Sequence, residues 1–202
     1  MVSITIDDHD RLYGSLPLNP PSNEIRLLRI LPGQDDQMVV CTLKSVSLDD
    51  EPFYEALSYH WGDPGICRPV IVYSEKEQRN CMLDVTRNLE AALRHLRFPG
   101  HSRTIWIDAI CINQRDLDEK FSQIPLMRKI YALATEVIVW LGESDQDSKM
   151  AMDHVRGLTF FLNPTREMLH AYDFVAHRQL LSFIRKSWWE RAWIIQEATV
   201  GK

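Results

Sequence analysis

Short apolar runs recur along the chain, and the segments between them carry apolar residues at helical spacing. The runs with strand character are Ala56–Tyr59, Ile105–Ile107 and Val137–Leu141. Between the first two, residues 87–96 repeat apolar positions every three or four residues after Thr86, whose hydroxyl can cap a helix. Strands that alternate with helices predict parallel neighbours in one sheet, with helices on both faces.

The N-terminal part of the chain predicts additions to this sheet. Residues 1–23 contain a Pro-Leu-Asn-Pro-Pro stretch and predict an irregular lead-in. Glu24–Leu31 and Met38–Leu43 predict an antiparallel pair, and Pro69–Tyr73 with Cys81–Leu83 predicts an inserted β-hairpin. We therefore expect an α/β fold, with a parallel sheet flanked by helices and additional antiparallel strands, in a single domain over residues 24–202.

The segment after Ile107 predicts a loop of roughly a dozen residues. Pro125 then fits the first turn of a helix that runs to Ala134. The apolar stripe of this helix is Ile124, Met127, Ile130, Tyr131 and Ala134. Further helices are expected over residues 166–186 and 190–198.

The composition indicates a soluble globular protein, because 45% of the residues are hydrophobic and 25% are charged. The net charge of −5 and the scattered basic residues give no reason to expect nucleic-acid binding. The four cysteines form no Cys-x-x-Cys pair and no metal-ligand spacing with the histidines, so we expect free thiols and no metal site. A secretory signal is not evident, and Val137–Leu141 is too short to cross a bilayer, so a cytoplasmic location is expected.

Polar residues follow each of the three strands that are expected to be parallel. Ligands of open parallel sheets bind beyond the carboxyl ends of the strands, so these residues are candidates for a site. The candidates after the first two strands are Ser58, Tyr59, Trp61, Gly62, Asp108, Asn113 and Gln114. The third cluster, Glu143–Asp145, is better explained by loop solvation and by a helix cap at Asp145.

Asp108 and a further candidate pair, Trp193 with Glu197, each have a structural alternative. A carboxylate at Asp108, directly after Ile-Trp-Ile, is expected to be partly buried, where it either rigidifies its own loop or contacts a ligand. Trp193 and Glu197 are four residues apart and share a helix face, which suits a flat or cationic ligand. The alternative is an Arg191–Glu197 ion pair beside core tryptophans, and the residues alone favour that alternative.

Five sequence blocks resemble the heterokaryon incompatibility (HET) domain, which triggers cell death in filamentous fungi. They are Tyr54–Gly62, Trp106–Gln114, Met127–Tyr131, Val139–Gly142 and Trp188–Glu197, and they occur in the family's order across residues 54–198. The chain departs from the family at Lys120, where an Arg is usual, and at Pro125, where the family lacks a proline. These departures leave the path of the loop before Met127 open.

HET domains are similar in turn to Toll/interleukin-receptor-type (TIR) domains, which implies a TIR-like, flavodoxin-like sheet. In TIR enzymes that cleave NAD, a glutamate four residues after a tryptophan is catalytic, and Glu197 has that spacing from Trp193. The resemblance implies an NAD glycohydrolase in which Glu197 stabilises the oxocarbenium-like ribose. Trp61 or Trp193 would stack on the nicotinamide, and Arg191 would contact the diphosphate. NAD would be the substrate and no cofactor is implied, because the chain has no Gly-x-Gly-x-x-Gly.

Other functions stay open beside this one. The resemblance also fits a non-enzymatic signalling module that acts by self-association and is activated by an upstream protein. A cysteine hydrolase using Cys111 and His60 is a weaker alternative, since a cysteine after a strand is more often a buried apolar residue. The chain ends shortly after Glu197, so a C-terminal truncation and a short natural protein are both open.

Overall fold

The computed structural model describes residues 7–144, 146, 148–150, 152–153, 181 and 185–190. The chain divides into two compact units, one with the described residues up to Trp140 and one with those from Leu141 to Glu190. In the second unit, η4 (Ser187–Glu190) holds the rings of Trp188 and Trp189 edge to face, with centroids 4.9 Å apart. The helices expected over residues 166–186 and 190–198 lie almost entirely outside the described residues. A single domain over residues 24–202 stays a prediction.

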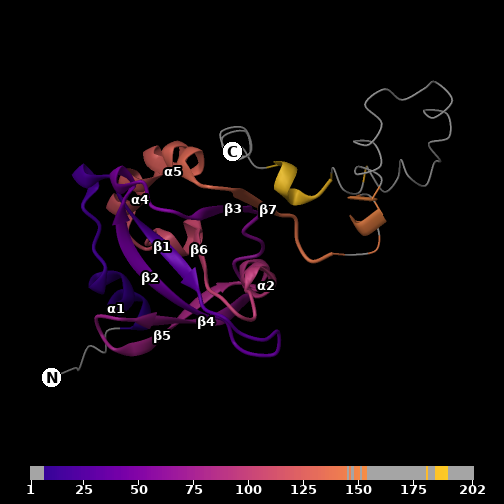
Figure 1. Cartoon of the computed structure of the whole chain (residues 1–202), viewed down its shortest axis with the longest axis horizontal. Helices are drawn as coiled ribbons and strands as arrows, with labels where there is room; N and C mark the ends of the chain where they lie inside the picture. Colours follow the sequence, from indigo (N-terminus) through magenta and orange to yellow (C-terminus); the bar gives the residue numbers. More distant parts are fainter. Residues whose placement is uncertain are drawn as a thin grey trace. The chain divides into compact units, whose positions relative to one another are not determined.

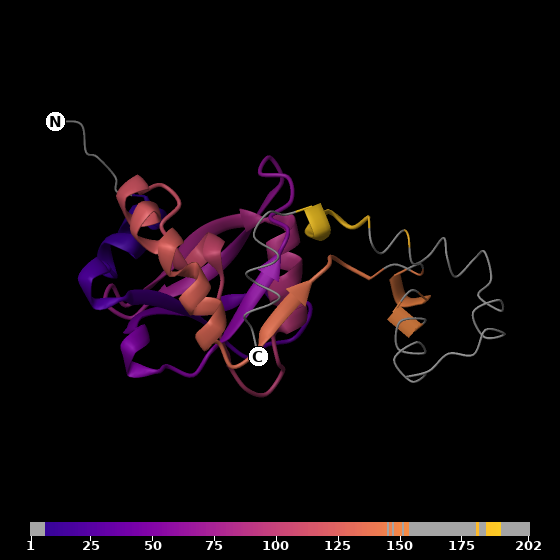
Figure 2. The same cartoon turned by 90° about the horizontal axis from the view of Figure 1, so that it is seen from above.

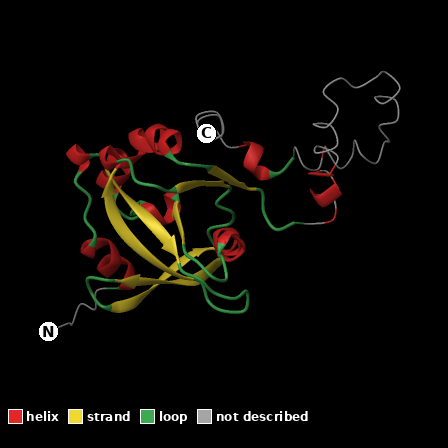
Figure 3. Ribbon diagram, in the orientation of Figure 1, coloured by secondary structure: helices red, strands yellow, loops and turns green. Residues whose placement is uncertain are grey.

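A mixed sheet of seven strands forms the centre of the first unit (Figures 1 and 3). Its order is β5-β4-β2-β1-β6-β3-β7. The strands are β1 (Glu24–Ile30), β2 (Val40–Ser47), β3 (Glu55–Tyr59), β4 (Cys67–Ser74), β5 (Arg79–Thr86), β6 (Arg103–Trp106) and β7 (Val137–Trp140). The α/β fold predicted from the sequence is confirmed.

The strand pairing also agrees with the sequence. β3 lies between β6 and β7 and runs parallel to both, with Ala56 opposite Trp106 on one side and Val137 on the other. β1 pairs antiparallel with β2, and β4 pairs antiparallel with β5 as the predicted hairpin. Two pairings were not predicted: β2 runs parallel to β4, and β1 runs antiparallel to β6. The antiparallel strands therefore continue the parallel three-stranded part in one sheet.

Helices cover both sides of the parallel strands. α2 (Arg87–Leu96) and α5 (Met127–Leu133) lie on opposite sides of β3 and β7 (Figures 1 and 2). Thr86 caps α2 by accepting a hydrogen bond from the Leu89 N–H, as predicted. The Tyr131 hydroxyl of α5 donates to the Leu57 carbonyl of β3 at 3.1 Å, which fixes the helix against the strand. No described helix has the length and apolar content that a membrane span requires.

The irregular lead-in predicted for residues 1–23 is wrong for residues 8–15 and 20–22, whereas residues 16–19 contain neither helix nor strand. Residues Asp8–Ser15 form helix α1, and Pro20–Ser22 form a short 3-10 turn, η1. Asp7 caps α1 by accepting from the Asp10 N–H, and the Tyr13 hydroxyl donates to the Ile110 carbonyl at 2.8 Å. The helix therefore depends on a long-range contact that local sequence does not show.

The loop predicted after Ile107 is also wrong, because helices α3 (Asp108–Cys111) and α4 (Leu117–Gln123) occupy it. Asp116 caps α4 by accepting from the Glu119 N–H at 3.0 Å. Pro125 lies in the 3-10 segment η3 (Ile124–Leu126), which joins α4 to α5. Met127, Ile130 and Tyr131 are buried as predicted, but Ile124 is exposed.

Candidate functional site

Trp61 and Asp108 meet at the carboxyl ends of the parallel strands. Trp61 follows β3, and Asp108 is the second residue after β6. The indole Nε1 of Trp61 donates to Asp108 Oδ2 at 2.8 Å, while Asp108 Oδ1 accepts from the Ala109 N–H at 2.8 Å. Asp108 is partly buried, and Trp61 keeps 38% of its surface exposed. Asp108 therefore rigidifies its own loop and also fixes an aromatic ring that remains accessible.

The backbone around this pair is held by further contacts. The Gln114 side-chain amide donates to the Asp108 carbonyl at 2.8 Å. Gly62 has φ +83°, and its N–H donates to His60 Nδ1 at 3.0 Å. A side chain at Gly62 would be strained by this φ, and its Cβ would lie 3.2 Å from the Asn88 Cβ. Gly62 therefore allows the turn that presents Trp61 beside Asp108.

Asn88 of α2 links the ends of two parallel strands, a role that the sequence did not reveal. Its side-chain nitrogen donates to the His60 carbonyl after β3, and its side-chain oxygen accepts from Trp140 Nε1 of β7 at 3.0 Å. The His95 ring packs against Trp140 with centroids 5.1 Å apart. Asparagine in the first turn of a helix that follows a hairpin gives no recognisable signal, because its partners are distant in sequence.

The other predicted site residues divide into three groups. Ser58 and Tyr59 are buried in β3 and do not reach the surface. Asn113 is turned elsewhere, since its backbone N–H donates to Glu119 and its side chain accepts from the Arg115 N–H. Arg191, Trp193 and Glu197 lie outside the described residues. The convergence of Glu197 with Asp108 stays a prediction.

A second site, which sequence reasoning missed, surrounds Arg26 of β1. Arg26 is 1% exposed, and its guanidinium makes two hydrogen bonds to the Glu119 carboxylate at 2.6 and 2.8 Å. It also donates to the carbonyls of Leu16 and Cys111. A basic residue inside the apolar run of β1 was the available signal, because a buried charge requires a partner.

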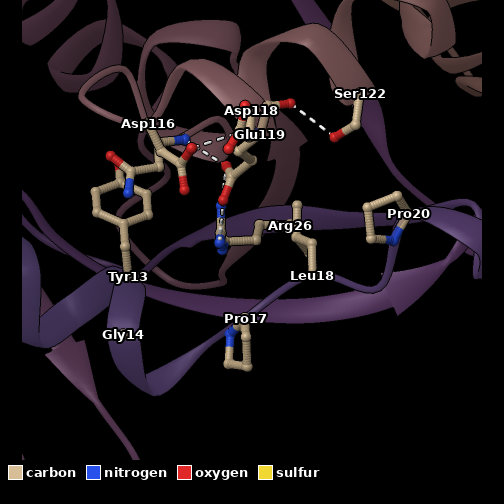
Figure 4. A pocket seen from close by; sticks show the side chains of 11 residues that line it. Tyr13, Gly14, Pro17, Leu18, Pro20, Arg26, Asp116, Asp118, Glu119 and Ser122 are labelled. Atoms are coloured by element: carbon tan, nitrogen blue, oxygen red, sulfur yellow. Dashed lines mark hydrogen bonds and ion pairs between the residues drawn. The ribbon is translucent and has the colours of Figure 1, made fainter.

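A pocket of about 390 Å³ opens beside this ion pair (Figure 4). Arg26 and Glu119 point toward each other in it, and prolines of the α1–β1 connection line one side. The lining residues are Tyr13, Gly14, Pro17, Leu18, Pro20, Arg26, Asn113, Asp116, Asp118, Glu119 and Ser122. The Arg26 guanidinium lies 5.0 Å from the centroid of the Tyr13 ring, and burial raises the pKa of the Tyr13 phenol. With Arg26 already paired, the pocket offers no free cation to an anionic ligand.

The structure gives the cysteine-hydrolase alternative no support. Cys111 is fully buried, and burial raises the pKa of its thiol to about 12. Its sulfur accepts a hydrogen bond from the Ile107 N–H at 3.3 Å. A nucleophilic cysteine needs an accessible thiol with a lowered pKa, which is the opposite of this environment.

Within the described part of the chain, one group of side chains could bring ligand atoms together at a metal. It consists of Asp7, His9 and Asp10, at the start of α1. Arg115 already binds this group, with its guanidinium 2.6 Å from Asp7 and 3.5 Å from Asp10. The group is therefore an ion-pair cluster.

The class of protein follows from comparison with known families. The family model for heterokaryon incompatibility proteins (HET) matches residues 54–197, which include β3, the Trp61–Asp108 pair and α5. The chain belongs to this family, and the resemblance found in the sequence is confirmed.

A curated relative shows the same relationship. Heterokaryon incompatibility protein 6, OR allele, of Neurospora crassa is 40% identical over 151 residues, which cover 70% of this chain and 22% of that protein. This chain therefore spans less than a quarter of the length of that relative. No solved structure matches the chain.

Proposed function

We propose that this chain is an effector module of fungal allorecognition that acts in programmed cell death. Its membership of the HET family and its 40% identity to an incompatibility protein support this role. The proposed location is the cytoplasm, and an upstream protein would activate the module by promoting self-association.

The proposed chemistry is hydrolysis of NAD or a related nucleotide at the carboxyl edge of β3 and β6. The observation that carries the proposal is the hydrogen bond from the Trp61 indole to Asp108, which fixes an exposed aromatic ring beside a carboxylate. Such a ring can stack on a planar nicotinamide or adenine base. This edge is also where ligands bind in open parallel sheets.

In the proposed reaction the bond between nicotinamide and C1′ of the ribose breaks, and water adds to C1′. The products are nicotinamide, ADP-ribose and a proton. Nicotinamide leaves as a neutral molecule, so no general acid is required. The Glu197 carboxylate would stabilise the positive charge that develops on the ribose. The other proposed substrate-binding residues are Ser58, Tyr59, Gly62, Asp108, Asn113, Gln114, Arg191 and Trp193. Support is weakest for Ser58 and Tyr59, which are buried, and for Asn113, whose N–H donates to Glu119.

The test compares wild type with Glu197→Gln in clustered protein supplied with NAD. Release of nicotinamide is expected to fall about a hundredfold or more in the variant, because glutamine keeps the size and removes the stabilising charge. Glu143→Gln is the matched control, since Glu143 is an exposed glutamate directly after the family block Val139–Gly142 and its variant is expected to keep full activity. Equal nicotinamide release by wild type and Glu197→Gln would contradict the catalytic role.

A non-enzymatic signalling module is the second candidate. The burial of Ser58 and Tyr59 favours it, because it leaves fewer polar groups for a substrate at the strand ends. It predicts that cell killing persists in Glu197→Gln and that nicotinamide is released by neither protein. Loss of killing together with a lower melting temperature would indicate a structural Arg191–Glu197 pair.

A further inference from the structure

The outer face of α4 and η3 carries apolar side chains that face solvent. Leu117, Phe121 and Ile124 follow one another at intervals of four and three residues, so they form one line along the helix. Their exposed fractions are 65%, 74% and 41%. Solvent-facing helix surfaces are normally polar, and clustered apolar side chains on them indicate a contact surface.

The opposite side of the same helical stretch packs into the first unit. Gln123 is buried and donates to the Glu24 carbonyl of β1, and Met127 and Ile130 are buried after it. The inner side therefore anchors the helix to the sheet. The outer line has no such role within the described part of the chain. Figure 1 shows α4 and α5 at the periphery of this unit, away from β5.

Opposite charges lie near the two ends of the outer line. Asp118 is next to Leu117, at the side of the line, and also lines the pocket beside Arg26; Arg128 of α5 lies four residues after Ile124, and both residues are exposed. Among the described residues, neither of them forms an ion pair. The face is thus acidic at its start, apolar in its middle and basic at its end.

This charge order makes the face complementary to itself in one orientation. If a second copy packs antiparallel with the two-fold axis between Phe121 and Ile124, the apolar residues of the two copies meet in the middle. At a rise of about 1.5 Å per residue in α4 and α5 and about 2.0 Å in the 3-10 segment η3, Arg128 then lies within about 3 Å, along the helix axis, of the level of Asp118 in the second copy. A parallel arrangement would place like charges together. A two-fold axis produces the favourable contact twice.

We infer that the outer face formed by Leu117, Asp118 and Phe121 of α4, Ile124 of η3 and Arg128 of α5 is a homodimer interface that binds a second copy of this chain antiparallel. The inference gives a surface to the self-association of the proposed function, and it rests on that function in this respect alone. The face excludes Trp61 and Asp108. One pair of helices buries less area than a standard interface, so a weak, concentration-dependent dimer is expected.

The test measures the oligomeric state of the full chain by sedimentation velocity over a concentration series, without nucleotide. Wild type is expected to dimerise, and Phe121→Asp is expected to weaken dimerisation about tenfold or more, because it places a charge at the centre of the apolar contact. Met82→Glu is the matched control, since Met82 is an exposed apolar residue of β5 and its variant is expected to dimerise like wild type.

Charge reversal tests the orientation independently of the apolar contact. Asp118→Arg and Arg128→Asp are each expected to weaken self-association, since each places like charges opposite one another in the two copies. An equimolar mixture of the two variants is expected to form heterodimers, because one chain then carries two arginines and the other two aspartates at these positions.

Three results would overturn the inference: a wild-type chain that stays monomeric at every concentration, a Phe121→Asp dimer as stable as wild type, or a mixture that associates no better than its components. Melting temperatures identify any variant that fails to fold. Dimerisation without nicotinamide release would support this interface and reject the enzymatic proposal. Nicotinamide release by a chain that stays monomeric would support the enzymatic proposal and reject this interface.

Discussion

Arg26 is a charged residue with 1% of its surface exposed, and the Glu119 carboxylate compensates its buried charge. Removing one partner of a buried ion pair leaves the other charge uncompensated. Glu119→Gln is therefore expected to lower the free energy of unfolding by about 3–5 kcal/mol, measured by urea denaturation. Lys129→Gln is the control, because it removes an exposed pair with Asp49 and is expected to leave the urea midpoint nearly unchanged.

A double variant separates the ion pair from packing. Arg26→Met with Glu119→Leu removes both charges and keeps apolar bulk, so it is expected to recover much of the stability that Glu119→Gln loses. A double variant less stable than Glu119→Gln would show that the hydrogen bonds of Arg26 to Leu16 and Cys111 matter more than its charge balance.

Gly62 is the residue on which the turn beside Trp61 depends. Gly62→Ala is expected to lower the free energy of unfolding by about 1–2 kcal/mol, because a Cβ is strained at φ +83° and lies 3.2 Å from the Asn88 Cβ. Gly100→Ala is the control, since a Cβ there meets nothing within 4 Å. The measurement is thermal unfolding, and equal melting temperatures of the two variants would contradict the strain.

Single residues were predicted well only where burial follows from their neighbours in sequence. Asp108 is partly buried, as its position after three apolar residues predicted. Its partner Trp61 could not be deduced, because the contact joins positions 47 residues apart. Arg26 and Glu119 are 93 residues apart, so only the unusual charge within β1 was visible.

At the scale of elements, α4 shows where sequence reasoning failed and why. Residues 117–123 are mostly polar, and their apolar members face solvent instead of the sheet, so no amphipathic pattern marked the helix. The helix is stabilised by its cap at Asp116 and by the Glu119–Arg26 pair. The three parallel strands were predicted correctly because apolar runs report burial directly.

The cap of α4 can be tested by substitution. Asp116→Ala is expected to lower the free energy of unfolding by about 1 kcal/mol, because the Glu119 N–H loses its acceptor. Asp116→Asn is the matched control, since asparagine caps about as well as aspartate and is expected to keep most of the stability. Chemical denaturation measures both, and a full loss in Asp116→Asn would assign the effect to charge.

At the scale of the whole molecule, the four cysteines show how far the core around the sheet is shielded from solvent. Cys41, Cys81 and Cys111 are buried, and Cys67 is exposed. Burial raises the pKa of Cys41 and of Cys111 to about 12, so both stay protonated and unreactive at mild alkaline pH.

Native protein at pH 8 is therefore expected to react rapidly with a chromogenic disulfide reagent at one thiol in four, and denatured protein at all four. Cys67→Ser is expected to abolish the rapid phase and leave the slow phase unchanged. Rapid modification of Cys111 in native protein would contradict the burial of its thiol.

The position of β3 between β6 and β7 has a consequence for synthesis on the ribosome. Both neighbours of β3 are encoded after it, so the nascent strand leaves the exit tunnel with two unsatisfied edges and an apolar sequence. The hairpins β1–β2 and β4–β5, by contrast, can close as soon as they are made. Until β7 has also left the exit tunnel, β3 is an unpaired apolar segment, so we expect chaperones to bind the nascent chain at this stage.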